Sequence, residues 1–401
     1  MNVAEQIVAQ LVDAGVHRIY GIVGDSLNPI VDAVRKTGGS KKGGIDWIHV
    51  RHEEAAAFAA SAEAQLTGKL AVCAGSCGPG NLHLINGLYD ANRTGAPVLA
   101  IASHIPSVQI GSTYFQETHP DRIFEECSVY NELISSAAQS PRTVNSAIRH
   151  AVGLGGVSVI TLPGDVSDLK AVEHVPTYAP TRPATLAPNP ADIDEAAALL
   201  NKADKVAIFA GAGVEGAHDE VIALADALKA PIGHALRGKH FIQYDNPFDV
   251  GMTGLLGYGA AAEGMNDADV LILLGTDFPY DQFLPDTPTI QVDTHAEKLG
   301  RRTDVGLAIH AQVKPFIEAL LPHLRAGRSD SFLKSKIKKH SEIMHAPVGA
   351  YTRNVEKMRP IHPEYAAHLL NETAAKDAIF TADTGMCNVW TARYIDPLGT
   401  R

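Results

Sequence analysis

Two adjacent carboxylates, Glu53 and Glu54, open a helical stretch that is almost all alanine, EEAAAFAASAEAQL. They follow an apolar run at 46–50 that predicts a strand, and open parallel sheets bind ligands beyond the carboxyl ends of their strands. One interpretation is structural, because acids in a first turn interact favourably with the helix dipole, by about 0.3–1 kcal/mol each. The other is chemical: a buried carboxylate is costly without a partner, and one that faces a ligand crevice is a candidate for proton transfer.

A glycine-rich stretch, GSCGPGN at 75–81, runs from the end of a predicted strand into a predicted helix. Such loops are typical of phosphate sites at helix N-termini, but this one lacks the Lys-Ser/Thr ending of a P-loop. The alternative is a tight turn that lets backbones pack closely. The sequence leaves both interpretations open.

The cysteine and histidine patterns do not indicate a metal centre. The four cysteines contain no CxxC pair, so disulfides and structural zinc are not expected, and a reducing cytoplasm fits. We expect Cys73 and Cys77 to be buried core thiols. The 18 histidines include no HxH or HExxH pattern with a matching carboxylate, so the sequence predicts no histidine-ligated metal.

A second group of candidate residues begins with Gly211-x-Gly213-x-x-Gly216, which follows a predicted strand and precedes a helix, as in dinucleotide-binding folds. The ribose-binding acid expected about 20 residues later is missing, which weakens an NAD-type interpretation. Arg237, Asp293 and the backbone amides of 251–257 would suit an extended dinucleotide, with the guanidinium on the pyrophosphate. The alternative is a packed α/β domain with glycine turns.

The elements that must position these residues form two similar series. Apolar runs at 17–23, 46–50, 69–75, 97–103 and 157–163 alternate with helical patterns, which predicts a parallel α/β sheet. A Pro-rich stretch at 178–192 predicts a linker, and a second α/β series follows it. The predicted fold class is therefore α/β, with two doubly wound parallel-sheet domains and the start of a third. The predicted segments are a first domain at 1–178, a linker at 179–192, a second domain at 193–330, a connecting segment at 331–358 and an incomplete third domain at 359–401. Within the last of these, 361–395 is expected to form a helix, a strand, a loop and a second helix.

The composition excludes several classes of protein. The net charge is −11, and the single basic run, Lys334 to Lys339, is typical of a solvated helix face, so nucleic acid is not an expected partner. No apolar run reaches the about 18 residues that a membrane span needs. The N-terminus is an amphipathic helix pattern that contains acids, unlike a signal peptide. We expect a cytoplasmic protein.

Several long motifs resemble one known family, the thiamine-diphosphate-dependent pyruvate oxidases, and within it the quinone-linked, FAD-containing pyruvate dehydrogenases. The resemblance covers essentially the whole chain. The motifs that carry it are VRHEEAAAFAASAEAQLTGKLAVCAGSCGPGNLHLINGLYDANR (50–93), SHIPSVQIGSTYFQETHP (103–120), GHALRGK (233–239), VGMTGLLGYG (250–259) and LLGTDFPY (273–280).

This resemblance implies three successive domains, which bind the aminopyrimidine of thiamine diphosphate, FAD, and the diphosphate through Mg²⁺. It implies that Glu53, rather than Glu54, hydrogen-bonds the aminopyrimidine, and that Phe115 and Gln116 lie near the flavin and the substrate as catalytic residues. Together with the motifs above, the expected cofactor-binding residues are Gly24, Glu53, Asn81, Gly211, Gly213, Arg237, Thr253, Gly254, Leu255, Leu256, Thr276, Asp277, Phe278, Pro279, Tyr280 and Asp293.

The implied reaction is oxidative decarboxylation of pyruvate to acetate and CO₂, with electrons passed through FAD to a quinone. The implied assembly is a homodimer or homotetramer, with thiamine sites between subunits. Two alternatives stay open: a carboligase similar to acetohydroxyacid synthase, and a non-catalytic flavin-binding fragment.

One family motif is not found. The family's Gly-Asp-Gly with downstream paired asparagines holds Mg²⁺, whereas the pairs Gly24-Asp25 and Gly164-Asp165 lack that context. The resemblance therefore predicts a chain truncated within the third domain, without metal ligands and with little turnover of its own. It also predicts peripheral membrane contact only for a longer form.

Overall fold

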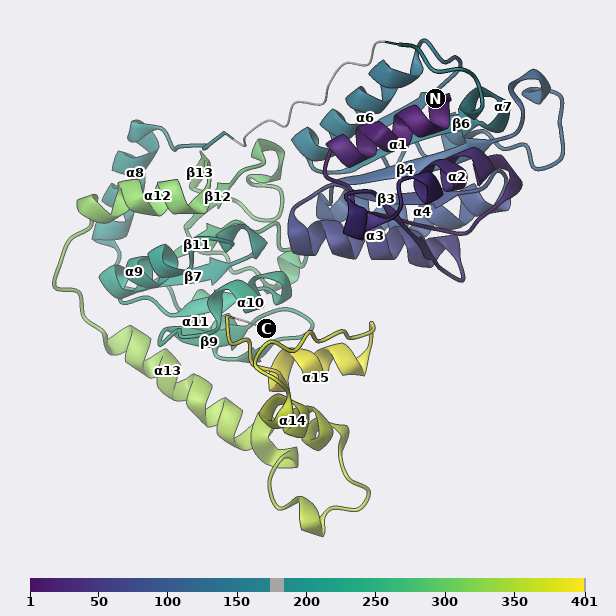
Figure 1. Ribbon diagram of the computed structural model, residues 1–401. Helices are drawn as coiled ribbons and strands as arrows, with labels where there is room; N and C mark the ends of the chain where they lie inside the picture. The colour runs from purple at the N-terminus through teal and green to yellow at the C-terminus, as the bar shows by residue number, and fades with distance from the viewer. Residues whose placement is uncertain (174–183, 400–401) are drawn as a thin grey trace. The chain divides into compact units, whose positions relative to one another are not determined.

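The computed structural model describes residues 1–173 and 184–399. The chain divides into two compact units, Met1–Arg182 and Pro183–Arg401, each built around its own sheet (Figure 1). The predicted linker at 179–192 lies partly outside the described residues, and the first helix of the second unit begins inside it, at Pro190.

Unit 1 contains a six-stranded, entirely parallel sheet in the order β2-β1-β3-β4-β6-β5. The strands are β1 (Arg18–Gly21), β2 (Asp46–His49), β3 (Ala71–Gly75), β4 (Val98–His104), β5 (Tyr130–Leu133) and β6 (Val157–Pro163). The helices are α1 (Val3–Asp13), α2 (Asn28–Lys36), α3 (Glu53–Thr67), α4 (Pro79–Thr94), α5 (Pro120–Ile123), α6 (Ser140–Leu154) and α7 (Gly164–Ser167).

Both faces of this sheet are covered, because alternate strand residues enter different cores. In β4, Leu99 and Ile101 pack with α1, α2 and α6, whereas Val98 and Ala100 pack with α3 and α4. This burial on both faces explains why the strands are continuous apolar runs in the sequence. The predicted α/β class is confirmed, and the additional strand β5 is a half-exposed edge.

Unit 2 contains a seven-stranded sheet in the order β10-β9-β8-β7-β11-β12-β13, parallel except for the β9–β10 pair. The strands are β7 (Val206–Ala210), β8 (Ile232–His234), β9 (Asp249–Met252), β10 (Tyr258–Gly259), β11 (Val270–Leu274), β12 (Thr289–Asp293) and β13 (Leu307–His310). The helices are α8 (Pro190–Lys202), α9 (His218–Leu228), α10 (Lys239–Ile242), α11 (Ala261–Asn266), α12 (Val313–Leu320), α13 (Ser331–Ile343), α14 (Pro363–Thr373) and α15 (Met386–Tyr394).

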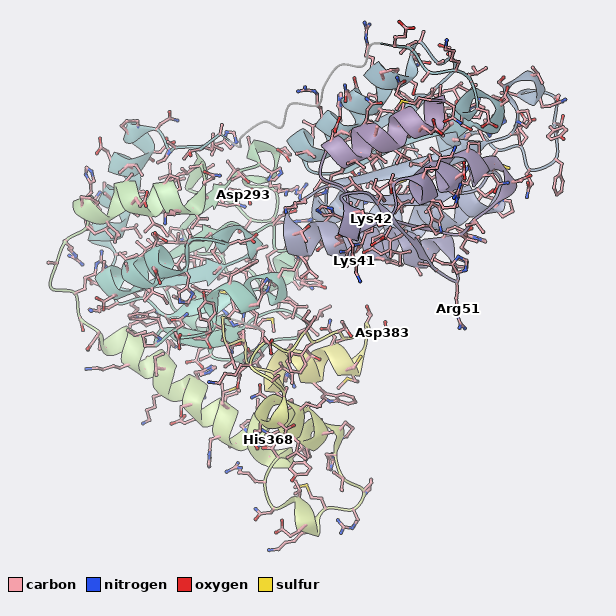
Figure 2. The ribbon with its side chains drawn as sticks, in the orientation of Figure 1. Lys41, Lys42, Arg51, Asp293, His368 and Asp383 are labelled. Atoms are coloured by element: carbon pink, nitrogen blue, oxygen red, sulfur yellow. The ribbon has the colours of Figure 1, made fainter. Side chains whose placement is uncertain are left out.

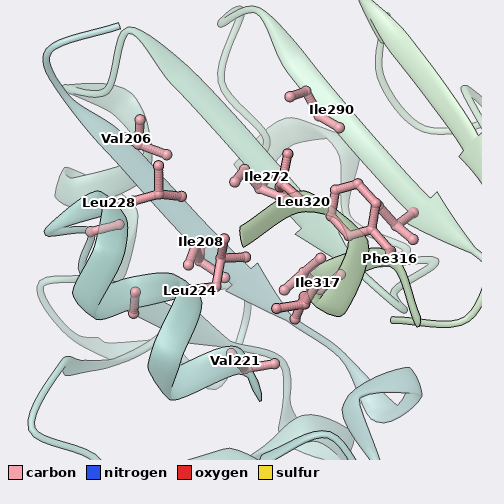
Figure 3. Close-up of a cluster of buried hydrophobic side chains, with 14 of the residues drawn as sticks. Val206, Ile208, Val221, Leu224, Leu228, Ile272, Ile290, Phe316, Ile317 and Leu320 are labelled. Carbon is pink, nitrogen blue, oxygen red and sulfur yellow. The ribbon is translucent and has the colours of Figure 1, made fainter. Parts of the chain in front are cut away.

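The main core of unit 2 lies between one face of this sheet and helices α8, α9 and α12. Ile208 and Ile272 from neighbouring strands contact Leu224 of α9 and Phe316 of α12 in one buried cluster (Figure 3). A smaller cluster on the other face includes Phe209. The doubly wound arrangement predicted for this part of the chain is therefore present.

The last segment, from α13 to α15, packs against the central sheet rather than forming a sheet of its own. The buried ammonium of Lys239 donates to the carbonyl of Ile395 at 2.6 Å, and Arg393 donates to the carbonyl of Gly257 at 3.0 Å. The strand predicted between α14 and α15 is absent from the described residues, so this prediction is wrong. A strand needs a neighbour to pair with, and Ile379 in this stretch is 84% exposed.

The expectation that Lys334–Lys339 forms a solvated helix face is wrong at one position. Lys336 is only 4% exposed, and its ammonium bonds Glu263 of α11 at 2.7 Å and Asp267, the C-cap residue of that helix, at 2.5 Å. This lysine therefore anchors α13 on the second unit. No helix among the described residues is both long and apolar enough to span a membrane.

Candidate functional site

Glu53 stands at the start of α3, directly after the short loop that leaves β2. His52 is the N-cap residue, and its Nδ1 accepts the Glu54 backbone N–H at 3.2 Å, which fixes where the helix begins. Glu53 is 7% exposed, whereas Arg51, two residues earlier, extends away from the body of unit 1 (Figure 2). The carboxylate is thus buried at the edge of the sheet where ligands bind in open α/β folds.

The partner of this buried carboxylate comes from the neighbouring helix. His83 of α4 places its Nδ1 3.0 Å from Glu53 Oε2, and its ring stacks on His52 with centroids 4.3 Å apart. His83 was not among the residues predicted from the sequence. The only local signal was its place in the motif GPGNLH, since 30 residues separate it from Glu53.

Small residues let α3 and α4 approach closely enough for this contact. A Cβ on Gly87 would lie 2.5 Å from Ala57 Cβ, and one on Gly80 would lie 3.2 Å from Glu53 Oε1. The many alanines of α3 are therefore explained by close packing of one face of this helix against α4. It is not packed on most sides, because Phe58 is 40% exposed.

The neighbouring carboxylate has different surroundings. Glu54 is half-buried, and its Oε1 accepts a hydrogen bond from the side-chain amide of Asn86. Its position in the first turn matches the structural interpretation of a helix-start acid. The structure thus distinguishes the two acids, and Glu53 is the buried one.

The loops that follow β1 and β3 meet beside this site. A Cβ on Gly24 would lie 2.3 Å from the hydroxyl of Ser76, so glycine allows the close approach. The hydroxyl of Ser26 lies 2.9 Å from that of Ser76 and 2.5 Å from that of Ser103. Asn81 is fully buried, and its amide donates to the carbonyl of Ser103 at 2.8 Å. Gly24 therefore allows the loops after β1 and β3 to approach each other, and Asn81 is hydrogen-bonded to β4.

The predicted catalytic residues Phe115 and Gln116 lie on a pocket of about 570 Å³ within unit 1. Phe115 is 78% exposed, and Gln116 has a φ of +65° and accepts a hydrogen bond from the Cys77 thiol at 3.4 Å. His104 also lines this pocket, and burial lowers its pKa, which favours a neutral imidazole. Glu53 does not line this pocket, so the pocket does not bring the carboxylate together with Phe115 and Gln116.

The cysteines of this region are core thiols, as predicted. Cys73 is fully buried and Cys77 is 4% exposed. Burial raises the pKa of Cys73 to about 12, so its sulfur stays a thiol at neutral pH and is unsuited to nucleophilic chemistry.

In unit 2 the predicted cofactor residues follow the carboxyl ends of several neighbouring strands. The strand order reverses between β7 and β11, which makes their loops the topological switch point. Gly211 and Gly213 follow β7, and the N–H of Gly213 donates to the carbonyl of Gly275 after β11 at 2.9 Å. A Cβ on Gly213 would lie 2.6 Å from Gly275 Cα. These glycines are therefore explained by loop packing, which gives the structural alternative a physical basis.

The remaining predicted residues surround the same edge of the sheet. Thr276, Phe278 and Thr253 are buried, and a Cβ on Gly254 would lie 2.9 Å from the Phe278 ring. Leu255 is 64% exposed. The other members of the predicted set are Leu256 and Tyr280, which are half-buried, and Arg237 and Pro279, which are exposed.

Two acids in this set already have partners within the chain. Asp277 pairs with Arg301 and Arg302, whose guanidiniums both contact its carboxylate. Asp293, labelled in Figure 2, is 6% exposed and accepts the His295 backbone N–H at 2.9 Å. Neither arginine was among the residues predicted from the sequence, and both add positive charge beside the switch point.

Family comparisons match both of the regions described above. Residues 1–123 match the family model described as thiamine pyrophosphate enzyme, N-terminal TPP binding domain, and residues 193–320 match that of the thiamine pyrophosphate enzyme, central domain. The chain belongs to the thiamine pyrophosphate enzyme family. Thiamine pyrophosphate is the cofactor called thiamine diphosphate above, so Glu53, His83, Phe115 and Gln116 lie within the residues that match the family's TPP binding domain.

Individual relatives support this assignment without agreeing on one reaction. The chain is 54% identical over 335 residues to an uncharacterized 42.6 kDa protein of Pseudomonas amyloderamosa, with 83% of each chain covered. It is 36% identical over 397 residues to the putative thiamine pyrophosphate-containing protein YdaP of Bacillus subtilis, with 98% of this chain and 67% of the relative covered. It is 30% identical over 391 residues to a pyruvate oxidase of Lactiplantibacillus plantarum, with coverages of 95% and 63%. Acetolactate synthases match at 28–29%.

Proposed function

We propose that this chain supplies two domains of a thiamine-diphosphate-dependent enzyme that decarboxylates pyruvate oxidatively to acetate and CO₂. In this proposal electrons pass through FAD bound by unit 2 to a quinone. The observation that carries the proposal is the buried carboxylate of Glu53, held at 3.0 Å by His83 in the thiamine-binding domain of the family. The similarity to a pyruvate oxidase supports the choice of reaction.

Thiamine diphosphate supplies an electron sink that permits decarboxylation of a 2-oxo acid. The task of Glu53 is to donate a hydrogen bond to the aminopyrimidine ring of the bound cofactor. Gly80 leaves space beside the Glu53 carboxyl. Any other residue at position 80 would reduce that space, because its Cβ would lie 3.2 Å from Glu53 Oε1. A hydrogen bond to a charged group contributes about 1.5–3 kcal/mol. His83 keeps the carboxyl oriented.

FAD would bind at the switch point of unit 2. The donors there suit a dinucleotide: the hydroxyls of Thr253 and Thr276 and the guanidinium of Arg237. Leu255 presents an exposed apolar side chain that would cover a ring system. Asp293 would bind through the second oxygen of its carboxylate, because the first accepts the N–H of His295.

We propose further that these 401 residues alone turn over little pyruvate. The two Gly-Asp pairs are engaged within unit 1: Asp165 accepts the N–H and the hydroxyl of Ser107 at 2.8 and 2.5 Å, and Asp25 accepts the N–H of Ser26 at 2.8 Å. Neither forms the carboxylate–amide set that Mg²⁺ prefers. The magnesium–diphosphate site would have to come from other residues.

A second copy of the chain is the proposed partner. The outer faces of α3 and α4 expose Phe58 at 40% and Leu82 at 45%, beside the Glu53 site. Apolar side chains of this size on adjacent helices are typical of an interface. A homodimer through this face would place the thiamine site between subunits, with a homotetramer as the larger form.

The second candidate reaction is carboligation to acetolactate. Acetolactate synthases match over 98% of this chain at 28–29% identity, which is close to the 30% of the pyruvate oxidase. A non-catalytic flavin-binding protein is the third candidate, supported by the engaged Gly-Asp pairs described above.

The test compares the chain with a chimera that continues, after residue 399, with the C-terminal third of the Bacillus subtilis relative. Each protein is supplied with pyruvate, Mg²⁺, thiamine diphosphate, FAD and a soluble quinone. Acetate, CO₂ and quinol produced in equal amounts by the chimera would support the oxidase. Acetolactate without quinol would establish the carboligase instead.

Two controls complete this experiment. The chain without the added segment is expected to bind FAD, visible as flavin absorbance, and to produce less than about 1% of the product of the chimera. Quinone reduction by the chain alone would refute the proposed inactivity and support the oxidase. A folded chimera that binds FAD but forms neither product would leave only the flavin-binding role.

A further inference from the structure

We propose that His52, Glu53 and His83 form a binding site for a borderline transition-metal ion, best suited to Zn²⁺, at the thiamine site. One nitrogen from each imidazole and one carboxylate oxygen lie within 4.8 Å of one another. Two imidazoles and a carboxylate are a ligand set that zinc uses in proteins, with a fourth position left open. The sequence motifs searched for metal sites consist of histidines that are close together in the chain. This set was not predicted because His52 and Glu53 stand at the start of α3, whereas His83 belongs to α4.

The three side chains differ in freedom in a way that suits metal capture. Zn–N and Zn–O bonds of about 2.0–2.2 Å require ligand atoms about 3–3.6 Å apart. His83 Nδ1 already lies 3.0 Å from Glu53 Oε2, and any ligand pair at the 4.8 Å limit would have to come closer by about 1 Å. The Glu53 side chain is 10% exposed, whereas those of His52 and His83 are 48% and 45% exposed, so the two imidazoles have room to move once their present hydrogen bonds are released. The buried carboxylate would anchor the ion, and the two imidazoles would close on it.

The charges at the site are balanced in favour of a cation. The N-terminus of α3 opposes positive charge here by about 0.3–1 kcal/mol. Against it stand two carboxylates, because Glu54 also lies near, with its Oε2 3.8 Å from His52 Nδ1. In the metal-free protein His83 Nδ1 bonds Glu53 and His52 Nδ1 accepts the Glu54 N–H. Metal coordination would replace these contacts.

The ligand types also predict which ions bind. Imidazole nitrogens suit Zn²⁺, Co²⁺ and Ni²⁺, whereas Mg²⁺ prefers oxygen ligands and keeps its waters. The site is therefore distinct in chemistry from the magnesium–diphosphate site of the proposed reaction. Zinc on Glu53 would occupy the carboxyl that the aminopyrimidine needs, so zinc and thiamine diphosphate would exclude each other. This last consequence, unlike metal binding itself, rests on the proposed function.

Calorimetric titration of the metal-free chain with Zn²⁺ tests the site. His83→Asn and His52→Asn are expected to weaken the tightest binding event by about tenfold or more. The matched control is His17→Asn, because His17 is an exposed histidine of the same unit and lies outside the cluster. Co²⁺ provides a second readout: the visible absorbance of the bound ion would be lost in both cluster variants and kept in the control.

Zinc affinity that is unchanged in both cluster variants, or lowered equally in the His17 control, would overturn the proposal. Circular dichroism of each variant ensures that lost binding is not lost folding, and Glu53→Gln provides a third variant that removes the oxygen ligand alone. Competition then separates the two proposals. This competition is measured in the chimera, with Mg²⁺ present: if zinc binds there through His83 but thiamine diphosphate neither binds nor competes, the metal site stands and the proposed function fails.

Discussion

The His83 imidazole and the Glu53 carboxylate lie 3.0 Å apart, although 30 residues separate them in the chain. Each belongs to a different helix, so the orientation of the carboxyl depends on how closely α3 and α4 pack. That packing depends in turn on Gly87 and on the alanines of α3. The chemistry of Glu53 and the stability of the helix pair are therefore coupled.

The two acids at the start of α3 are expected to respond differently to the same substitution. In the chimera described above, Glu53→Gln should lower kcat/KM for pyruvate by at least about a hundredfold, since positioned proton donors contribute that much. Glu54→Gln should change kcat/KM by less than about threefold, because it removes a half-exposed helix-start charge. Steady-state kinetics measure both. Equal losses in the two variants would contradict the special role of Glu53.

Two helical glycines should respond in opposite directions to alanine. Gly87→Ala should destabilise unit 1 by about 2–3 kcal/mol, because the new Cβ would meet Ala57 Cβ at 2.5 Å and the Phe58 backbone at 2.8 Å. Gly153→Ala should stabilise it by about 0.5 kcal/mol, since nothing lies within 4 Å of that Cβ and the helix gains an alanine. Chemical denaturation followed by circular dichroism measures both. A Gly87→Ala variant as stable as the wild type would show that α3 and α4 are not this close.

Two lysines of one helix provide a second matched pair. Lys336→Ala should cost about 1–3 kcal/mol, because it leaves Glu263 and Asp267 without their buried partner. The partners are half-exposed, which keeps the cost below that of a fully buried pair. Lys338→Ala, at a position 79% exposed, should cost less than about 0.5 kcal/mol. Indistinguishable unfolding curves for these variants would place Lys336 on the solvent side of α13.

Lys239 should make the stability of unit 2 depend on alkaline pH. Burial lowers the pKa of its ammonium to about 8, from 10.5 in the unfolded chain. Below pH 8 both states hold the proton, and between pH 8 and 10.5 the unfolded state binds more protons. The contribution of Lys239 to the free energy of unfolding should therefore rise across this window, by about 3 kcal/mol in total.

The measurement is the difference in unfolding free energy between the wild type and Lys239→Met as a function of pH. Tyrosines and other groups that titrate in this range cancel in the difference. It should stay constant below pH 8 and grow in favour of the wild type up to pH 10.5. A difference that does not vary with pH would mean that the Lys239 ammonium is solvated.

The strands predicted best from the sequence are those buried on both faces. Long apolar runs such as 97–103 and 157–163 correspond to β4 and β6 almost residue for residue. The missed strands include short ones at or near a sheet edge, which depend on a neighbour more than on their own pattern. β5 is half-exposed, β13 is the last strand of the second sheet, and β10 has two residues paired antiparallel with β9, which was also missed. The opposite error, a predicted strand near Ile379, arose because an apolar run without a partner strand forms no sheet.

The candidate site shows the same limit. The order of strand and helix was enough to place Glu53 at the edge of the sheet, and the family motifs separated it from Glu54. His83, Arg301 and Arg302 were missed, because each matters through a contact with a residue 24 or more positions away. Such contacts arise only when the helices and loops pack together, so the spacing of residues along the chain does not reveal them.

The interlock of Gly211 and Gly213 with Gly275 also limits how this crevice can diversify. A side chain at any of the three positions would collide with the backbone of the opposite loop, so no single substitution there opens a route to a new ligand. Changes in ligand preference are instead expected at exposed positions beside these loops, such as Leu255 and Pro279. The three glycine positions are thus constrained by packing, so variation in ligand preference among related sequences would be confined to the residues around them.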